Sequence, residues 1–181
     1  MSRINVVNRE TASIEQAQLF DAIQSQLGMV PNFLKVLANS PAALKAFLGL
    51  HEISNQGSLE PPTRERIALA LAQQNACDYC LSAHTALGRK AGLSNTEIEA
   101  NRAGSSEDDK AAAAVKFAVA LAEHSGEVTT AEILAVRNAG YDDAEIVEII
   151  THVGLNILSN IIGKASRVEI DFPTVEMKLA S

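Results

Sequence analysis

The sequence of 181 residues lacks long apolar runs, an excess of basic charge and a leader-like start. No apolar stretch reaches the roughly 18 residues that a membrane-spanning helix needs, so we expect no membrane segment. The net charge of −7 argues against a surface that binds nucleic acid or anionic lipid. The opening residues, MSRINVVNRETASIEQ, contain no hydrophobic signal-peptide core. We therefore expect a cytoplasmic protein with no nucleic-acid or membrane partner.

Cysteine is scarce too, and the only two, Cys77 and Cys80, lie within NACDYCLSAHTALGRKAG. A structural disulfide is disfavoured in a reducing cytosol, so a chemical role explains the pair better. A zinc site needs a fourth ligand beside these thiols and His84, and no second Cys/His cluster supplies it. One of the other three histidines could still fold back to do so. Covalent haem attachment needs histidine directly after the second cysteine, where the chain has Leu81.

Strand patterns are rare, and helix signals dominate what remains. Ser94 with Glu97 and Thr129 with Glu132 fit capping boxes, and Pro41 stands where a helix begins. Only INVV near the start and RVEIDFPTVEM near the end look extended, and we expect both to run over the surface. Apolar spacing and these signals predict helices over about 13–27, 31–38, 41–55, 62–74, 76–91, 94–103, 107–124, 129–138 and 142–166.

The chain shows no low-complexity linker and no domain boundary. We therefore expect one all-α domain over 1–181, with its core at about 15–166 and an extended C-terminal tail. SAHTALGRKAGL can be aligned with ILSNIIGKASRV so that Gly88 matches Gly163. That weak similarity leaves open whether the helical bundle is built from two related halves.

Both cysteines belong to a predicted helix that also carries His84. At ~100° per residue, Cys77, Cys80 and His84 fall within about 60° of one another, on an arc shared with apolar residues. With Asn75 as N-cap, Cys77 would lie in the first helical turn, where the helix dipole favours a thiolate. We expect a polar stripe on the opposite side of this helix, formed by Asp78, Ser82, Thr85 and Arg89. A redox dithiol is the favoured interpretation, with inert buried thiols or zinc as alternatives.

The last predicted helix is apolar nearly all round, so we expect it to be buried. Four polar residues nevertheless lie near one of its faces: His152, Asn156, Ser159 and Asn160. They are either satisfied core or interface groups, or the lining of a cavity above the dithiol.

These motifs resemble the AhpD-like and carboxymuconolactone decarboxylase superfamily of all-helical proteins. Its redox members share a glutamate, then Cys-x-x-Cys, then a histidine four residues on, which here reads Glu65, Cys77, Cys80 and His84. The stretch 27–50 is similar to the N-terminal half of the peroxidase-related subgroup. The resemblance covers most of 15–165 and implies an AhpD-like helical bundle.

The resemblance implies a hydroperoxidase or thiol–disulfide oxidoreductase that uses no cofactor and no metal. Cys80 would be the peroxidatic thiol and Cys77 the resolving one, although these roles could be exchanged. His84 and Glu65 would form a proton relay. Without the resemblance, Glu65 reads more simply as a solvated helix charge paired with Arg66 or a nearby lysine.

The implied partners are a hydroperoxide and a dithiol or lipoyl-type protein reductant, and family members form homo-oligomers, often trimers or hexamers. One departure is Tyr79, since the best-known member has histidine at that place. The alternatives to a hydroperoxidase are a cofactor-free lyase of the decarboxylase type, which needs no resolving thiol, and a non-catalytic redox sensor.

Overall fold

The structure, a computed structural model, describes residues 1–178, and these form nine α-helices and one 3₁₀-helix with no strand among them. The all-α prediction is confirmed, and each predicted helix has its counterpart. The last three residues of the expected domain, 179–181, lie outside the described part. The elements are η1 (Arg9–Thr11), α1 (Ile14–Leu27), α2 (Asn32–Leu37), α3 (Pro41–Ser54), α4 (Pro61–Gln74), α5 (Asp78–Lys90), α6 (Asn95–Arg102), α7 (Asp109–Glu123), α8 (Thr130–Asn138) and α9 (Asp143–Ser166).

Local capping explains why these helices begin where they do. Thr129 and Glu132 form the predicted reciprocal capping box at the start of α8. Pro41 occupies the first position of α3, where its missing N–H costs nothing. Ser94 accepts a hydrogen bond from the Glu97 N–H, but the Glu97 carboxylate turns away to Arg66. The second half of that predicted box is therefore wrong.

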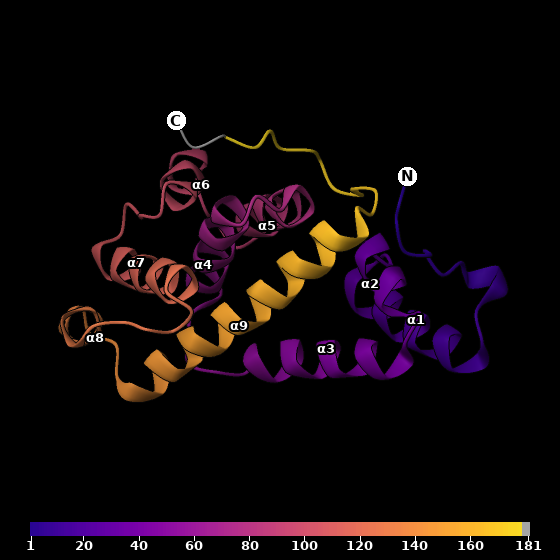
Figure 1. The fold of residues 1–181 in the computed structure, drawn as a ribbon, viewed down its shortest axis with the longest axis horizontal. Coiled ribbons are helices and arrows are strands. Elements are labelled where there is room, and N and C mark those ends of the chain that lie inside the picture. The colour runs from indigo at the N-terminus through magenta and orange to yellow at the C-terminus, as the bar shows by residue number, and fades with distance from the viewer. Residues whose placement is uncertain (179–181) are drawn as a thin grey trace.

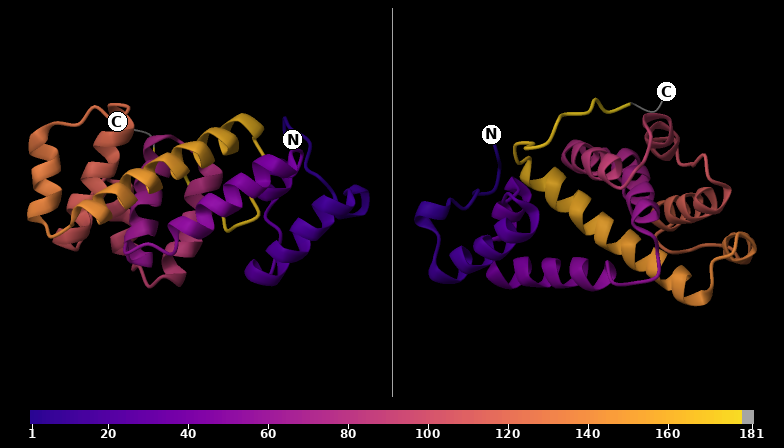
Figure 2. Two further views of the ribbon diagram at one scale, coloured as in Figure 1. Left: turned by 90° about the horizontal axis from the view of Figure 1, so that it is seen from below. Right: turned by 180° about the vertical axis from the view of Figure 1, so that it is seen from behind.

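Helix α9 crosses the whole molecule and organises the other elements (Figure 1). On one side of it stand α4, α5 and α7, and on the other lie α1, α2 and α3, as the rotated views also show (Figure 2). Helix α4 contacts α5, α6, α7 and α9. The segment that leads into the cysteine helix is therefore at the centre of the packing.

Apolar side chains gather in two clusters on either side of α4. One joins α2 and the N-terminal segment to the cysteine helix and includes Phe20, Phe33, Leu44, Cys80 and Leu81. The other packs α4 against α7, α8 and α9 and includes Ile67, Phe117, Val136 and Ile149. Burial of these side chains stabilises each cluster by roughly 1.5–3 kcal/mol per large residue.

Helix α9 is not buried all round, which corrects the expectation from its composition. A stripe along one face stays exposed and consists of Val147, Ile150, Leu158 and Ile161. By length and composition alone α9 could also cross a membrane, but 44% of its most apolar window is buried inside the fold. A core helix passes the same test, so the apolar character of α9 reflects its central place in the packing and one uncovered face.

The segment after α9 runs in extended form over α5 towards α6 (Figure 1). The Val175 N–H donates to the hydroxyl of Ser82, and the Arg102 guanidinium donates to the Glu176 carbonyl. Ser82 and Thr85 are consequently buried. The predicted polar stripe of α5 is therefore partly covered by the C-terminal segment, which is far away in the sequence.

Candidate functional site

The two cysteines form a disulfide at the start of α5. Cys77 is the N-cap, and its sulfur accepts from the Cys80 N–H at 3.3 Å. The predicted N-cap, Asn75, instead ends α4, and Ala76 between the helices has a φ of 50°. The prediction failed because a sharp break separates α4 from α5. Cys80 therefore lies in the first turn and Cys77 at the N-cap, so the helix N-terminus favours a thiolate at either position.

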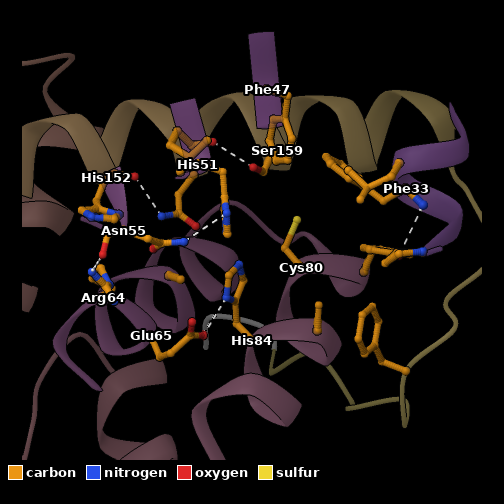
Figure 3. A pocket seen from close by; sticks show the side chains of 18 residues that line it. Phe33, Phe47, His51, Asn55, Arg64, Glu65, Cys80, His84, His152 and Ser159 are labelled. Carbon is orange, nitrogen blue, oxygen red and sulfur yellow. Dashed lines mark hydrogen bonds and ion pairs between the residues drawn. The ribbon is translucent and has the colours of Figure 1, made fainter. Parts of the chain in front are cut away.

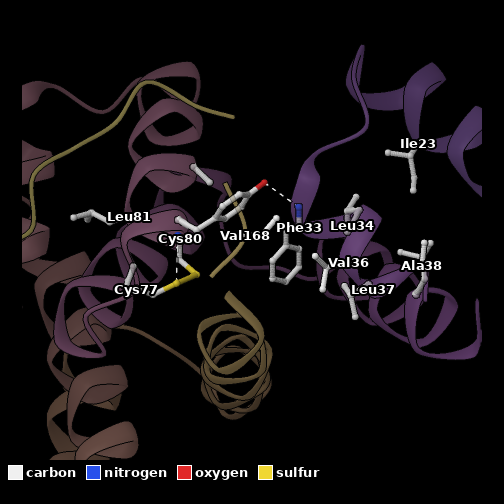
Figure 4. Close-up of a cluster of buried hydrophobic side chains, with 14 of the residues drawn as sticks. Ile23, Phe33, Leu34, Val36, Leu37, Ala38, Cys77, Cys80, Leu81 and Val168 are labelled. Atoms are coloured by element: carbon white, nitrogen blue, oxygen red, sulfur yellow. Dashed lines mark hydrogen bonds between the residues drawn. A yellow bond between two sulfur atoms is a disulfide. The ribbon is translucent and has the colours of Figure 1, made fainter. Parts of the chain in front are cut away.

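The disulfide is packed against the backbone of α9. Cys77 is 1% exposed and Cys80 is 3% exposed, so both sulfurs face inward as their helical phase predicts. A Cβ atom placed on Gly163 of α9 would lie 3.0 Å from the Cys77 sulfur and 3.5 Å from the Cys80 sulfur. Figure 4 shows the disulfide beside the cluster of buried apolar side chains. Only a residue without a side chain allows this close approach.

Glu65 and His84 meet across the contact between α4 and α5. Nδ1 of His84 lies 2.9 Å from Oε2 of Glu65, and the two side chains are only 20% and 22% exposed. Arg66, the expected alternative partner of Glu65, pairs instead with Glu97 at 2.6 Å. When Nδ1–H donates to the carboxylate, Nε2 of the imidazole is left to accept or deliver a proton.

Cys80, Glu65 and His84 line one cavity of about 150 Å³ (Figure 3). The structure thus brings three of the four predicted site residues to one wall, and the disulfide ties the fourth, Cys77, to them. Its apolar and aromatic lining residues are Pro31, Phe33, Leu34, Phe47, Ala68, Tyr79, Ala83, Leu155 and Phe172. Figure 3 shows Phe33 at one end of the cavity and His152, Asn55 and Arg64 at the other, which is the polar end.

The polar end includes three of the four residues singled out on the last helix. His152, Asn156 and Ser159 line the cavity, whereas Asn160 accepts a hydrogen bond from Asn75 at 2.8 Å. Of the two interpretations of that polar face, the lining of a cavity is therefore correct for three residues. Nε2 of His152 is buried without a hydrogen-bond partner among the described residues.

Burial, together with the Arg64 guanidinium, lowers the pKa of His152 below its ordinary value. A neutral imidazole at this place can accept a hydrogen bond from a ligand or donate one to it. Three further lining residues escaped the sequence analysis: His51, Asn55 and Arg64. His51 belongs to α3, Asn55 directly follows that helix, and Arg64 precedes Glu65 in α4. No local sequence motif marks them.

Tyr79, the one departure from the best-known member of the superfamily, lines the same cavity. Its side chain is 7% exposed, its ring stacks on Phe33, and its hydroxyl donates to Asp171 at 2.6 Å. Burial and the bond to Asp171 raise the pKa of Tyr79 well above its ordinary value. Tyr79 therefore joins α5 to α2 and to the C-terminal segment. Within residues 1–178, no three His, Cys, Asp or Glu side chains are grouped to hold a metal ion.

Residues 1–178 thus combine a buried Cys-x-x-Cys disulfide with a Glu–His pair in an all-helical fold. Residues 41–124 match the model of the carboxymuconolactone decarboxylase family. Together with the structural likeness described next, this match supports a place for the chain in the AhpD-like and carboxymuconolactone decarboxylase superfamily.

Two solved structures share nearly the whole fold. An uncharacterized peroxidase-related protein from Silicibacter sp. TM1040 is 26% identical with a TM-score of 0.80, covering 92% of this chain and 89% of that one. The alkylhydroperoxidase AhpD core protein from Ralstonia eutropha JMP134, also peroxidase-related, is 24% identical with a TM-score of 0.84, covering 94% and 92%. The second likeness shows the fold alone.

A curated relative matches over a shorter stretch. The uncharacterized protein YdfG of Bacillus subtilis (strain 168) is 31% identical over 85 residues, which are 47% of this chain. The match covers 57% of that relative, little more than half of its length.

Proposed function

We propose that this protein is a dithiol hydroperoxidase that reduces organic hydroperoxides through Cys77 and Cys80. The observation that carries the proposal is the Glu65–His84 pair, which lines the same cavity as Cys80. A structural disulfide would have no need of a paired, partly buried imidazole at its side. A proton relay next to a thiol is what peroxide reduction requires.

In the proposed cycle the Cys80 thiolate attacks the O–O bond of a hydroperoxide. The sulfur becomes a sulfenic acid, and the departing alkoxide takes a proton from His84 to leave as an alcohol. The Cys77 thiol then attacks the sulfenic sulfur, which forms the disulfide and releases water. Glu65 supports this step by holding Nδ1 of His84, so that the imidazolium formed on proton uptake is stabilised.

The cavity supports Cys80 as the peroxidatic thiol. Cys80 lines the space that also holds His84, whereas Cys77 does not line it. Cys80 is also in the first turn of α5, where the helix N-terminus stabilises a thiolate. A cavity of about 150 Å³ with an aromatic end fits a molecule about the size of benzene, so the expected substrate is a compact organic hydroperoxide.

Turnover needs an external reductant, for which we propose a dithiol, either a lipoyl-type group on a protein or a free dithiol. We further propose that the protein is a homo-oligomer. The exposed apolar stripe of α9, defined above by Val147, Ile150, Leu158 and Ile161, supports this because such a stripe is costly in water.

The test is peroxide consumption with tert-butyl hydroperoxide, a compact substrate about the size of benzene, and a dithiol donor. Cys80→Ser should abolish turnover, while Cys77→Ser should leave one rapid oxidation of Cys80 without recycling through a disulfide. Mass analysis after one equivalent of peroxide should show the Cys77–Cys80 bridge in the parent protein. Peroxide turnover that survives Cys80→Ser, or two thiols that stay reduced, would refute the proposal.

A second candidate is a cofactor-free lyase that acts on an organic anion. The polar end of the cavity favours it, because Arg64, His51 and His152 all line that end. Such a reaction has no use for a resolving thiol. Decarboxylation of a lactone acid that persists in a Cys77→Ser/Cys80→Ser variant would favour the lyase over the hydroperoxidase.

A further inference from the structure

The two cysteines of the disulfide line different recesses. Cys80 lines the 150 Å³ cavity with His84, whereas Cys77 lines a second recess of about 470 Å³ between the start of α5 and the end of α9. Each cysteine is almost fully buried. Figure 3 shows Cys80 among the residues around the first cavity, and Cys77 is not among the residues that line it.

The second recess has its own chemistry. Lys164 and Arg167 line it, both are exposed, and the one carboxylate among its lining residues is that of Asp78. This cationic character stands out on a chain with a net charge of −7. The first cavity, by contrast, combines aromatic and aliphatic side chains with the Glu65–His84 pair and other polar groups. The two recesses therefore suit different molecules.

Gly163 connects this recess to the disulfide. It lines the recess, and a Cβ atom there would lie 3.0 Å from the Cys77 sulfur. The absence of a side chain at this position lets the backbone of α9 pack directly against the Cys77 sulfur, so that Cys77 lies at the boundary between α9 and the recess. Lys164, the next residue, extends its ammonium group to the Asn75 carbonyl at 2.7 Å, which holds this cation at the rim near the end of α4.

We propose that the second recess is the docking site of an anionic dithiol reductant, which attacks Cys77 from the side opposite to the hydroperoxide cavity. This inference rests on the proposed dithiol redox function and adds to it a separate place of entry. Of the two kinds of reductant proposed above, the cations select the free dithiol, because a lipoyl group amide-linked to a protein carries no carboxylate. Lys164 and Arg167 attract the carboxylate of such a dithiol acid and raise its local concentration. Oxidant and reductant then approach the same bond from two sides and do not compete for one cavity.

The proposed reductive step is a pair of thiol–disulfide exchanges. One thiolate of the reductant attacks the Cys77 sulfur in line with the disulfide, forms a mixed disulfide and expels Cys80 as a thiolate. The second thiol of the reductant then attacks the mixed disulfide, closes a cyclic disulfide and releases Cys77 as a thiol. The reductant loses two electrons and two protons, which end on the two cysteines.

This direction of attack leaves Cys80 ready for the next cycle. The expelled Cys80 thiolate is released into the cavity that holds the Glu65–His84 pair, where the hydroperoxide is expected to bind. An imidazolium at His84 stabilises that thiolate, and a better stabilised leaving group leaves faster. The division of the site therefore gives Cys77 to the reductant and Cys80 to the oxidant.

The first experiment measures reduction of the oxidised protein separately from its oxidation. Dihydrolipoate is the anionic probe and dithiothreitol the neutral one, and the reaction is acid-quenched, alkylated and followed by mass. In Lys164→Glu/Arg167→Glu we expect the rate with dihydrolipoate to fall about tenfold or more, and the rate with dithiothreitol to change by less than about threefold. Oxidation by tert-butyl hydroperoxide should stay within about twofold of the parent rate, because that step uses the other cavity.

A matched control changes the same charge elsewhere. Lys90→Glu/Lys116→Glu alters two exposed lysines that line neither recess. It should leave both reduction rates near those of the parent protein. Lys164→Gln/Arg167→Gln removes the charge without reversing it, so the rate with dihydrolipoate should fall by a smaller factor. This variant also keeps the test valid if the double charge reversal does not fold. Added salt should reduce the advantage of the parent protein.

Single-cysteine variants identify the sulfur that this recess serves. In Cys80→Ser, reaction of Cys77 with the anionic disulfide 5,5′-dithiobis(2-nitrobenzoate) should slow about tenfold on Lys164→Glu/Arg167→Glu. In Cys77→Ser, the reaction of Cys80 should be insensitive to that change. The proposal would be overturned if Lys164→Glu/Arg167→Glu slowed the reaction of Cys80 but not that of Cys77. It would also be overturned if dihydrolipoate reduced Lys164→Glu/Arg167→Glu and Lys90→Glu/Lys116→Glu at equal rates. Neither measurement uses peroxide turnover, so failure of the hydroperoxidase proposal would be seen separately.

Discussion

Nδ1 of His84 lies 2.9 Å from Oε2 of Glu65, although 19 residues separate the two in the chain. The contact joins α4 to α5 beside the disulfide. If it forms the proton relay, Glu65→Gln should lower the kcat/KM of hydroperoxide reduction by about 10²-fold, because the imidazolium loses its anionic partner. His84→Gln should cost at least as much, and the double variant little more than His84→Gln alone, because the two residues act as a unit.

Glu60→Gln is the control for the relay, since Glu60 precedes α4 and makes no side-chain capping bond. Its activity should match that of the parent protein. Purely additive losses for Glu65→Gln and His84→Gln would show that the pair does not work as a relay.

The close approach of Gly163 to the disulfide predicts that this position tolerates no side chain. A new Cβ at 3.0 Å from the Cys77 sulfur crowds a buried bond. We expect Gly163→Val to lower the free energy of unfolding by about 1–3 kcal/mol. The measurement is urea unfolding of the oxidised proteins.

Gly49→Ala provides the comparison, because a Cβ at Gly49 in α3 would meet nothing within 4 Å. There the better helix propensity of alanine should stabilise the protein by about 0.5–1 kcal/mol. Equal effects at the two glycines would contradict the role given to Gly163.

The hydroxyl of Tyr79 and the carboxylate of Asp171 form a bond that anchors the C-terminal segment. Asp171 also accepts from the Asn32 N–H, so the segment is tied to α2 as well. In a double-mutant cycle, Tyr79→Phe and Asp171→Ala should show a coupling of about 1–3 kcal/mol in the free energy of unfolding. Phe172→Leu, next to Asp171 but without a hydrogen bond to Tyr79, should show no coupling of that size with Asp171→Ala.

Acid should weaken the fold through Glu97. Burial acts to raise the pKa of this carboxyl, but hydrogen bonds from Ser106, Asn101, the Glu107 N–H and Arg66 prevail and lower it to about 2. Because the folded pKa lies below the unfolded one, the stabilisation is present above the unfolded value and is lost as the pH falls from about 5 to about 2. The loss should be on the order of 2–3 kcal/mol.

Urea unfolding of the parent protein and of Glu97→Gln, at several pH values between 7 and 2.5, checks this dependence. The variant should be less stable at pH 7 and should lose less stability on acidification. Glu123→Gln, an exposed carboxylate at the end of α7, is the control. Parallel pH profiles for Glu97→Gln and the parent would contradict the expectation.

The exposed apolar stripe of α9 predicts self-association. Leu158→Glu/Ile161→Glu places two charges in the middle of that stripe and should shift the oligomer to a smaller species, as measured by light scattering. Leu134→Glu on α8, an exposed apolar residue outside the stripe, should leave the mass unchanged. A parent protein that is monomeric at micromolar concentration would end this proposal.

The sequence by itself determined the nine α-helices of residues 1–178, because caps, prolines and apolar spacing act within one or two turns of the backbone. It also determined that Cys80 and His84 share a face, since their separation of four residues is one turn of the helix that carries both. The tertiary structure decided what depends on packing between elements. It brought Glu65 to His84, turned part of the polar face of α9 into a cavity wall, and covered Ser82 with the C-terminal segment. Only the packed fold placed Cys77 and Cys80 in the walls of separate recesses. Helix α9 contributes residues to both walls and packs against the disulfide at Gly163.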